Sequence, residues 1–465
     1  MTQTNRGPRF APSDLVDFVI VGSGAAGGIL AKELSAAGFA VVVLEQGPRL
    51  GPADFDHDEF GMAYQMKLAN HPLTQPHTFR ATAADTARPM LAVIYGRLVG
   101  GSNAHFTGNF WRLRPIDFNE ASVLGGVPRA GLVDWPITYD ELEPYYTKVE
   151  WDVGVSGLAG ASPFEPPRTK PYPMPPLPVK SSGVLMEKGA RALGLHAQPT
   201  PMAINSEPYD GRPPCQHCGF CLFFMCEFGA KSTSMAAMLP RAEATGRCEL
   251  RPGSYVARVE TNDSGRATGV AYFDAKKRLH LQRAKAVVLC ANGAETPRLL
   301  LNSASSRFPN GLANSSGAVG KYLMFNTSLP VETNTIGIDP SLKDGWGLPC
   351  MRVTYFDHPD DLKCAEFLVA RATEIAQAAG AIKTWPERVQ PQTLAVHLLG
   401  TCRMGNDRRT SVIDRFHRTH DVPNLFICDG SSMVTSSRGQ PTETISALAF
   451  RAGEHITALA KRGEI

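Results

Sequence analysis

The sequence lacks a long uninterrupted apolar run. No stretch approaches the ~18–20 residues that a membrane-spanning helix needs. The first residues, MTQTNRGPRFAPSDLVDFVIVG, also lack the charged and then apolar pattern of a secretory signal. We therefore expect no direct membrane span. We expect the protein to be cytoplasmic by default, or periplasmic by co-export with a partner that carries the signal.

Runs of a single charge are also missing. The 47 basic and 44 acidic residues give a formal net charge of +3, without any basic cluster. Nucleic acids and anionic membranes attract proteins through such clusters, so neither is an expected partner. At 465 residues the chain is long enough for two or three domains, or for one large interleaved architecture.

A disulfide framework is absent as well. Six of the ten cysteines occur singly along the chain, which is typical of reduced thiols in a protein core. These six are Cys248, Cys290, Cys350, Cys364, Cys402 and Cys428. The other four lie within CQHCGFCLFFMC, residues 215–226, and need a separate explanation.

Residues 18–45 have the pattern of a dinucleotide site. The apolar run 18–21 predicts a buried parallel strand, and a helix follows the glycine-rich turn formed by Gly22, Gly24 and Gly27. In this pattern the glycines permit the turn, the approach of a diphosphate and the close packing of the helix on the strand. A second strand ends at Glu45, where a carboxylate can accept hydrogen bonds from ribose hydroxyls. The pattern alone leaves NAD and FAD open.

Four distant segments share recognisable motifs: GRLVGGSNAHFTGNFWR (96–112), VVLCANGAETPRLLLNS (287–303), HLLGTCRMG (397–405) and NLFICDGSSMVTSSRGQPTETISALAFRAGEHI (424–456). They resemble the glucose–methanol–choline (GMC) flavoprotein oxidoreductases. Two further segments, DWPITYDELEPYY (134–146) and NSEPYDGRPPC (205–215), resemble in particular the catalytic subunits of bacterial FAD-dependent glucose, gluconate and related sugar dehydrogenases. The resemblance implies an α/β fold in which a Rossmann-like FAD-binding domain is interleaved with an α+β substrate domain. A second strand-and-turn unit near the C-terminus independently favours FAD over NAD, because a long cofactor can span both ends of the chain.

The implied FAD-binding domain is discontinuous and comprises residues 12–50, 90–115, 230–320 and 405–465. The substrate or cap domain then comprises residues 51–89, 116–229 and 321–404, including the cysteine-rich loop 215–226. Relatives insert a long piece of sheet between about Leu329 and Asp339, where this chain is short. We therefore expect a shortened substrate domain, with a smaller open pocket, a partner-completed pocket or an impaired enzyme as its consequence.

The resemblance also assigns further cofactor-binding residues. Gly100 and Gly101, followed by Ser102 and His105, correspond to the loop that lies against the isoalloxazine ring. His105 is either hydrogen-bonded near the flavin or covalently bound to it, as in some members. The remaining residues assigned to FAD are Asp429, Gly430, Pro441 and Thr442.

A catalytic pair follows from the same motifs. Oxidation of an alcohol by hydride transfer requires a base for the hydroxyl proton, and an imidazole titrates in the right range. The resemblance assigns this role to His397 and a substrate-positioning role to Gln440, where relatives have histidine or asparagine. Phe325 and Asn326 likewise replace an Asp-His pair that is usual in relatives.

The four clustered cysteines predict an inorganic centre. The resemblance implies an iron–sulfur cluster, 3Fe–4S rather than 4Fe–4S, held by Cys215, Cys221 and Cys226, with Cys218 as a spare or fourth ligand. Zinc and an inert apolar loop are the alternatives. Zinc sites usually need a second C-x2-C pair, which is missing.

Together these features predict an FAD-dependent dehydrogenase that oxidises a hydroxyl group of a sugar or polyol. Its electrons would leave through the iron–sulfur cluster to a haem or quinone acceptor. The implied partners are a small chaperone-like subunit and a haem-containing acceptor subunit. An oxygen-using GMC alcohol oxidase and a flavin and iron–sulfur electron-transfer protein without alcohol turnover are the alternatives.

Overall fold

The apolar run near the N-terminus forms the middle of a seven-stranded sheet. The computed structural model describes residues 9–465, so the first eight residues of the segment inspected for an export signal lie outside it. Strand β1 (Val16–Val21) runs parallel to β2 (Val41–Leu44), with Phe18 opposite Val41. Helix α1 (Ala25–Ala36) connects the two strands, and Ile29, Leu30 and Leu34 are buried in it. This is the predicted strand–turn–helix–strand unit.

The sheet is assembled from segments that are far apart in the sequence. Its order is β5-β2-β1-β8-β7-β6, and β11 pairs with β8 outside this path. Strand β8 pairs in parallel with β1 and β11 through its C-terminal half, and antiparallel with β7 through its N-terminal half. The bounds are β5 (Cys248–Arg251), β6 (Tyr255–Thr261), β7 (Ala267–Phe273), β8 (Leu279–Leu289) and β11 (Leu425–Ile427).

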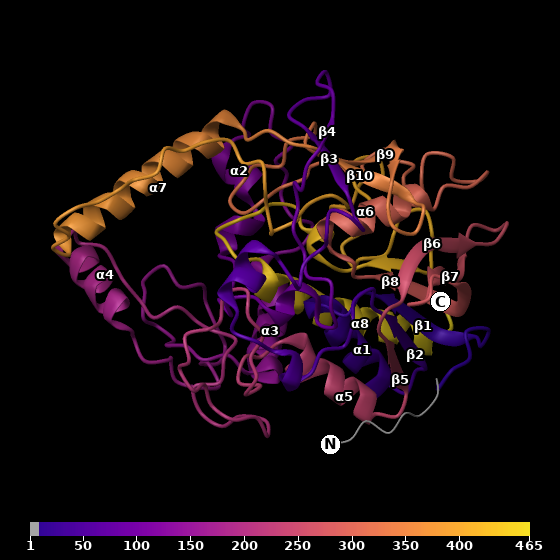
Figure 1. Cartoon of the computed structure of the whole chain (residues 1–465), viewed down its shortest axis with the longest axis horizontal. Helices are drawn as coiled ribbons and strands as arrows, with labels where there is room; N and C mark the ends of the chain where they lie inside the picture. Colours follow the sequence, from indigo (N-terminus) through magenta and orange to yellow (C-terminus); the bar gives the residue numbers. More distant parts are fainter. Residues whose placement is uncertain (1–8) are drawn as a thin grey trace.

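Helices from both ends of the chain cover this sheet (Figure 1). Helix α8 (Thr442–Lys461) packs on α1 and on α3 (Tyr139–Val149), so the C-terminal helix joins the N-terminal nucleotide-binding unit. The other helices around the sheet are α5 (Leu239–Ala244) and α6 (Asn292–Asn302), while the short α2 (Glu120–Leu124) lies at the periphery. None of the helices within residues 9–465 combines the length and the apolar character that a bilayer crossing demands.

A second, smaller sheet lies apart from the first (Figure 1). Its order is β4-β3-β10-β9, with bounds β3 (His77–Arg80), β4 (Arg88–Pro89), β9 (Thr335–Lys343) and β10 (Pro349–Thr354). Strand β9 begins only a few residues after Leu329, so the chain has no room for a longer sheet insertion there. The predicted α/β architecture with two interleaved parts is confirmed.

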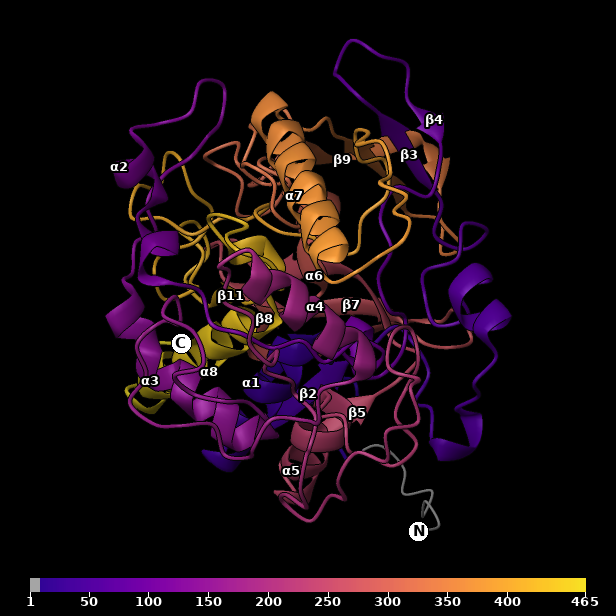
Figure 2. The same cartoon turned by 90° about the vertical axis from the view of Figure 1, so that its left-hand side faces the viewer.

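An arm of two helices projects from the body of the molecule (Figures 1 and 2). Helix α7 (Pro359–Ala378) contains no buried residue and contacts α4 (Ser181–Ala192). Cys364 lies exposed on α7, so its prediction as a core thiol is wrong. The helix that carries it has no core to face. The other five single cysteines are buried, and all ten are free thiols.

Candidate functional site

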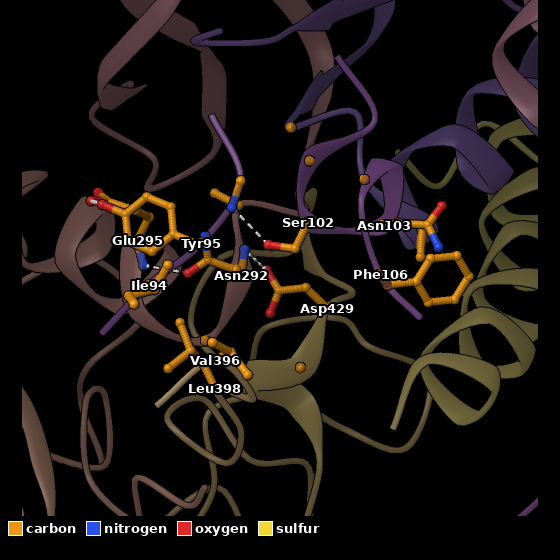
Figure 3. Close-up of a pocket in the computed structure, with 18 of the residues that line it drawn as sticks. Ile94, Tyr95, Ser102, Asn103, Phe106, Asn292, Glu295, Val396, Leu398 and Asp429 are labelled. Atoms are coloured by element: carbon orange, nitrogen blue, oxygen red, sulfur yellow. Dashed lines mark hydrogen bonds between the residues drawn. The ribbon is translucent and has the colours of Figure 1, made fainter. Parts of the chain in front are cut away.

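A cavity of about 680 Å³ opens at the carboxyl ends of the parallel strands. Val21, Leu44 and Cys290, at or just beyond the ends of β1, β2 and β8, belong to its wall. This is the edge at which α/β sheets bind ligands, because strands and helices there present backbone groups toward a crevice. Figure 3 shows side chains from segments far apart in the sequence, among them Tyr95, Glu295 and Asp429, around the cavity.

The glycine-rich turn forms one end of the cavity. Gly22 has a φ of +96°, and a Cβ there would lie 2.4 Å from the Cys290 carbonyl oxygen. A Cβ on Gly27 would lie 2.1 Å from the Gly22 carbonyl oxygen, so α1 packs directly on the turn. Gly24 differs, because the nearest atom to its Cβ would be 3.8 Å away. Gly24 and Gly22 line the cavity, whereas Gly27 lies behind it.

Glu45 lies beside this turn and braces it. Its Oε2 accepts hydrogen bonds from the Ser23 amide (3.1 Å) and hydroxyl (2.7 Å), and its Oε1 accepts one from the Gly47 amide (3.0 Å). Burial raises the pKa of the carboxyl, and these hydrogen bonds oppose the shift. Glu45 also lines the cavity, so its carboxylate can hold the turn and face a ligand together.

The 100–105 loop lies next to the same turn. Gly100 (φ +93°) and Gly101 (φ +54°) precede a 3-10 turn over Gly101–Ala104. Gly100 lies outside the cavity wall and donates its amide to the Ser23 hydroxyl (2.9 Å), while Gly101, Ser102 and His105 line the cavity. The structure places this predicted loop at the cavity and separates its supporting from its facing residues.

His105 presents a free ring nitrogen inside the protein. Its Nε2 is buried without a hydrogen-bond partner among residues 9–465. Burial, with a contribution from nearby Lys231, lowers the pKa of His105 to about 4, so the ring is neutral at pH 7. A neutral imidazole on the cavity wall is compatible with both predicted roles, as a hydrogen-bonding group or as an attachment point.

The C-terminal strand-and-turn unit closes the other side. Asp429 Oδ2 accepts from the Asn292 amide (3.1 Å) and the Thr296 hydroxyl (2.6 Å), and Oδ1 accepts from the Ser431 amide (2.8 Å). This carboxylate therefore joins the start of α6 to the turn after β11 (Figure 3). Asp429, Gly430, Pro441 and Thr442 all line the cavity.

The two predicted catalytic residues face the same cavity from different segments. His397 is half-buried, and desolvation lowers the pKa of its imidazole below the ordinary 6.5. Gln440 is carried by the turn that leads into α8, and its Oε1 is buried without a partner in the described part of the chain. A base and an unsatisfied amide oxygen thus share one cavity.

The sequence motifs assigned no individual role to several polar residues in the wall. Asn103 accepts a hydrogen bond from the Ser234 amide at Oδ1, and Asn109 lines the cavity nearby. On another side, Tyr95 donates its hydroxyl to Glu295. Both asparagines lie within the motif 96–112, so their polar character in an otherwise buried segment was the available signal.

The cavity suits FAD. The start of α1 presents unpaired backbone amides beside Gly24, which is the arrangement that binds a diphosphate. The free His105 Nε2 and Gln440 Oε1 lie along the wall, as polar groups do when a ligand supplies their partner. A dinucleotide could therefore reach from the glycine-rich turn to the residues around His397.

The cysteine-rich loop has a different geometry. Cys215, Cys221 and Cys226 are half-buried and Cys218 is exposed. Across residues 9–465, no three His, Cys, Asp or Glu side chains are grouped so that they could hold a metal ion. The thiols as arranged do not form a ligand set, and the iron–sulfur cluster stays a prediction.

The loop is instead held by hydrogen bonds to its backbone. Lys231 Nζ donates to the carbonyl oxygens of Phe106 (2.8 Å), Cys221 (2.9 Å) and Phe224 (2.8 Å). The Phe223 amide donates to the His105 carbonyl oxygen (3.1 Å). Leu222 and Phe223 consequently line the cavity, so the loop is part of the site even without a metal.

Comparisons with known proteins agree with this geometry. Two family models described as GMC oxidoreductase match residues 16–326 and 330–449. The 2-methyl-1,2-propanediol dehydrogenase of Mycolicibacterium austroafricanum is 32% identical, covering 96% of each chain. The fructose dehydrogenase large subunit of Gluconobacter japonicus is 29% identical, covering 96% of this chain and 98% of its own.

Solved structures share the fold. Pyridoxine 4-oxidase from Mesorbium loti has a TM-score of 0.62 at 18% identity, covering 94% of this chain and 98% of its own. The alignment with the propanediol dehydrogenase spans 544 positions, more than the 465 residues of this chain, so this chain lacks segments that the relative carries. The family models, the fold and the cavity lead to one conclusion: this chain belongs to the GMC oxidoreductases, FAD-dependent enzymes that oxidise CH–OH groups of alcohols or sugars.

Proposed function

We propose that the protein is an FAD-dependent dehydrogenase of a sugar, a polyol or a related diol, with His397 as its base. The observation that carries the proposal is the shared cavity, which His397, Gln440 and the glycine-rich turn all line. The resemblance and the relatives' names indicate the reaction class, and we place the reaction in this cavity.

Different parts of the cavity wall would bind the cofactor and the substrate. The turn at Gly22 and Gly24, with the start of α1, would hold the diphosphate of FAD, and the 101–105 loop would face the isoalloxazine. Bound FAD supplies an acceptor for the hydride that leaves the alcohol carbon. A ring nitrogen of His397 takes the hydroxyl proton, and the Gln440 side-chain amide orients the substrate oxygen.

The environment of His397 suits a base at neutral pH. Because burial lowers its pKa below 6.5, the imidazole is unprotonated at pH 7 and can accept a proton. The Gln440 side-chain N–H group can donate to the substrate oxygen, which leaves the single hydroxyl proton for His397. The two side chains thereby hold the alcohol, which loses its proton from the hydroxyl group and its hydride from the carbon.

The relatives support a hydroxyl substrate but differ in their acceptors. The printed names include the dehydrogenases above and the gluconate 2-dehydrogenase flavoprotein of Pantoea cypripedii, 26% identical. They also include the paromamine 6'-oxidase of Streptomyces fradiae, 28% identical. We favour a dehydrogenase because the loop that lines the cavity through Leu222 and Phe223 also carries four thiols, which an oxidase that uses oxygen would not need.

Partner subunits belong to the same proposal. One relative is named a large subunit, which implies an assembly with other chains in that protein. By analogy we propose a small chaperone-like subunit and a haem-containing acceptor subunit for this chain. Co-purification of the chain with the products of neighbouring genes, followed by mass spectrometry, would test this assignment.

Anaerobic mixing of the flavin-loaded protein with sugars, polyols and diols tests the function. We expect one class to bleach the flavin absorbance near 450 nm, about the usual position for a flavin, and to be turned over with an artificial electron acceptor. Rapid reoxidation by oxygen with stoichiometric peroxide would identify an oxidase instead. Failure of every hydroxyl compound to bleach the flavin would leave an electron-transfer protein without alcohol turnover.

A further inference from the structure

The wall of the active-site cavity carries negative but no positive charge. Three carboxylates, Glu45, Glu295 and Asp429, belong to it, and no lysine or arginine does among the residues that the structure describes. Glu295 is also present in Figure 3, beside Tyr95. Glu45 and Asp429 border the part of the cavity that we assign to FAD, so Glu295 is the carboxylate left to repel an anionic substrate.

Two buried cations near the cavity, Arg298 and Lys231, use their donors on protein acceptors. Arg298 donates through Nη2 to Asp344 (2.7 Å) and through Nε to the Pro349 carbonyl oxygen (3.0 Å), and Nη1 donates to Glu295 (3.1 Å). Lys231 uses its three N–H groups on three backbone carbonyl oxygens of the cysteine loop and its neighbour. Neither side chain has a donor left for a substrate carboxylate or phosphate.

The two histidines on the wall add no charge at neutral pH. Burial lowers the pKa of His105 to about 4 and lowers that of His397 below 6.5. Both rings are therefore neutral at pH 7. Within the described wall no side chain supplies a positive charge for a substrate anion, and burying an unpaired anion is costly.

The lip of the cavity is apolar and faces solvent. Leu394 and Val396, which directly precede His397, are 45% and 50% exposed, and Leu222 and Phe223 from the cysteine loop are 54% and 39% exposed. These two segments are far apart in the sequence, yet both line the same cavity. A substrate rich in hydroxyl groups would lose its water there without gaining hydrogen bonds, whereas an alkyl group would bury apolar surface.

We propose that this cavity selects an uncharged alcohol that carries an apolar group, bound with its hydroxyl at His397 and Gln440 and its apolar group against Leu394 and Val396. This inference rests on the proposed dehydrogenase function and narrows its substrate class. We expect branched short-chain diols to be better substrates than sugars. We expect sugar acids and phosphorylated sugars not to be substrates.

A panel of diols of graded polarity tests the class. We expect kcat/KM for anaerobic flavin reduction to fall at least about tenfold from 3-methylbutane-1,2-diol to glycerol, and at least tenfold again to glycerate. Faster reduction by glycerol, glucose or glycerate overturns the substrate class while the dehydrogenase function stands. Reduction by no member of a wide panel overturns both.

An isosteric inhibitor pair separates binding from chemistry. Pivalamide and pivalate have the same shape and lack a carbinol C–H bond, but only pivalate is charged. We expect pivalamide to compete with the diol at a concentration at least about tenfold lower than pivalate. Equal or stronger competition by pivalate contradicts a cavity that rejects anions.

Leu394→Lys places a cation on the lip, with Leu281→Lys as its matched control. Both leucines are 45% exposed, and Leu281 lies on β8 outside the cavity wall, so neither change disturbs packing. We expect L394K to raise the glycerate-to-diol ratio of kcat/KM about tenfold or more and L281K to leave it unchanged. An unchanged ratio in L394K overturns the placement of the substrate against this lip.

Discussion

At the scale of single residues, two polar atoms in the cavity wall lack a protein partner. Gln440 Oε1 and His105 Nε2 are buried without partners in the described chain, although most buried polar atoms in proteins are paired. Glu45 and Asp429 behave differently, since several protein amides and hydroxyls bind their carboxylates. The two atoms without partners are available to a ligand, and the hydrogen-bonded carboxylates stabilise the wall.

His397→Asn should slow anaerobic flavin reduction by about 10²–10⁴-fold, the usual contribution of a general base. Bound flavin should remain, because the change leaves the glycine-rich turn intact. His196→Asn is the control, since His196 is exposed and lies outside the cavity wall. Stopped-flow absorbance measures the rate, and an H397N rate within a few-fold of the unaltered protein would remove His397 from the mechanism.

The pH dependence of the same rate gives a second measurement. A base with a lowered pKa stays unprotonated as the solution is acidified, so the acid limb of the profile should lie below pH 6.5. An inflection clearly above pH 6.5 would show that another group limits the reaction. Rates measured at saturating substrate report the pKa in the complex.

At the scale of elements, the glycines in the turn between β1 and α1 have two different roles, one in folding and one in cofactor binding. Gly22→Ala and Gly27→Ala would drive a methyl group into backbone, whereas Gly24→Ala meets no protein atom closer than 3.8 Å. A methyl group at Gly24 would instead project toward the cavity where a diphosphate must approach.

Gly24→Ala should therefore yield a folded protein with at least about tenfold weaker FAD binding. Gly51→Ala is the control, because its φ of −118° suits alanine and its Cβ would lie 3.9 Å from the nearest side-chain atom. Circular dichroism checks the fold, and flavin absorbance after gel filtration measures retention. Full retention of FAD by G24A would place the diphosphate elsewhere.

Among the predicted elements, the cysteine-rich loop has the role that the structure supports least. We still expect iron and acid-labile sulfide in protein purified without oxygen, and their loss in Cys221→Ser. Insertion of a cluster would have to draw the thiols together, since they form no ligand group as arranged. Cys364→Ser, at the exposed thiol on α7, is the control. Metal analysis and EPR spectroscopy would contradict the prediction if neither iron nor sulfide were present.

At the scale of the whole molecule, buried histidines connect stability to pH. Burial lowers the pKa values of His77 and His417 to about 4, and each has one ring nitrogen without a partner in residues 9–465. Protonation would create a buried cation without an acceptor. The folded state therefore binds fewer protons than the unfolded state between the two pKa values.

Stability should consequently fall as the pH drops from 6.5 to about 4. The shift of each histidine corresponds to on the order of 3 kcal/mol of unfolding free energy across that range. Denaturant unfolding at several pH values measures the slope, and His417→Gln should flatten it. A slope unchanged in H417Q would show that His417 does not contribute.

The sequence by itself determined the nucleotide-binding fold unit and supplied the predicted site residues. Strand, glycine-rich turn, helix and acid follow one another within thirty residues or so, and their pattern reflects local backbone sterics that neighbouring residues enforce. His397 and Gln440 were accessible through the motifs around them. Even the shortened substrate domain was visible as missing sequence between residues 329 and 339.

Only the tertiary structure decided which of these residues face the cavity. Gly27 and Gly100 support the wall from behind, whereas Asn103, Asn109 and Glu295 line the cavity. Which residues line the cavity depends on how β1, β8 and β11 bring distant segments together. The charge of the cavity is also a tertiary property. Arg298 donates to Asp344 and Lys231 donates to the Phe106 carbonyl oxygen, and both acceptors are distant in the sequence. The local sequence therefore does not show which cations have a donor available for a ligand.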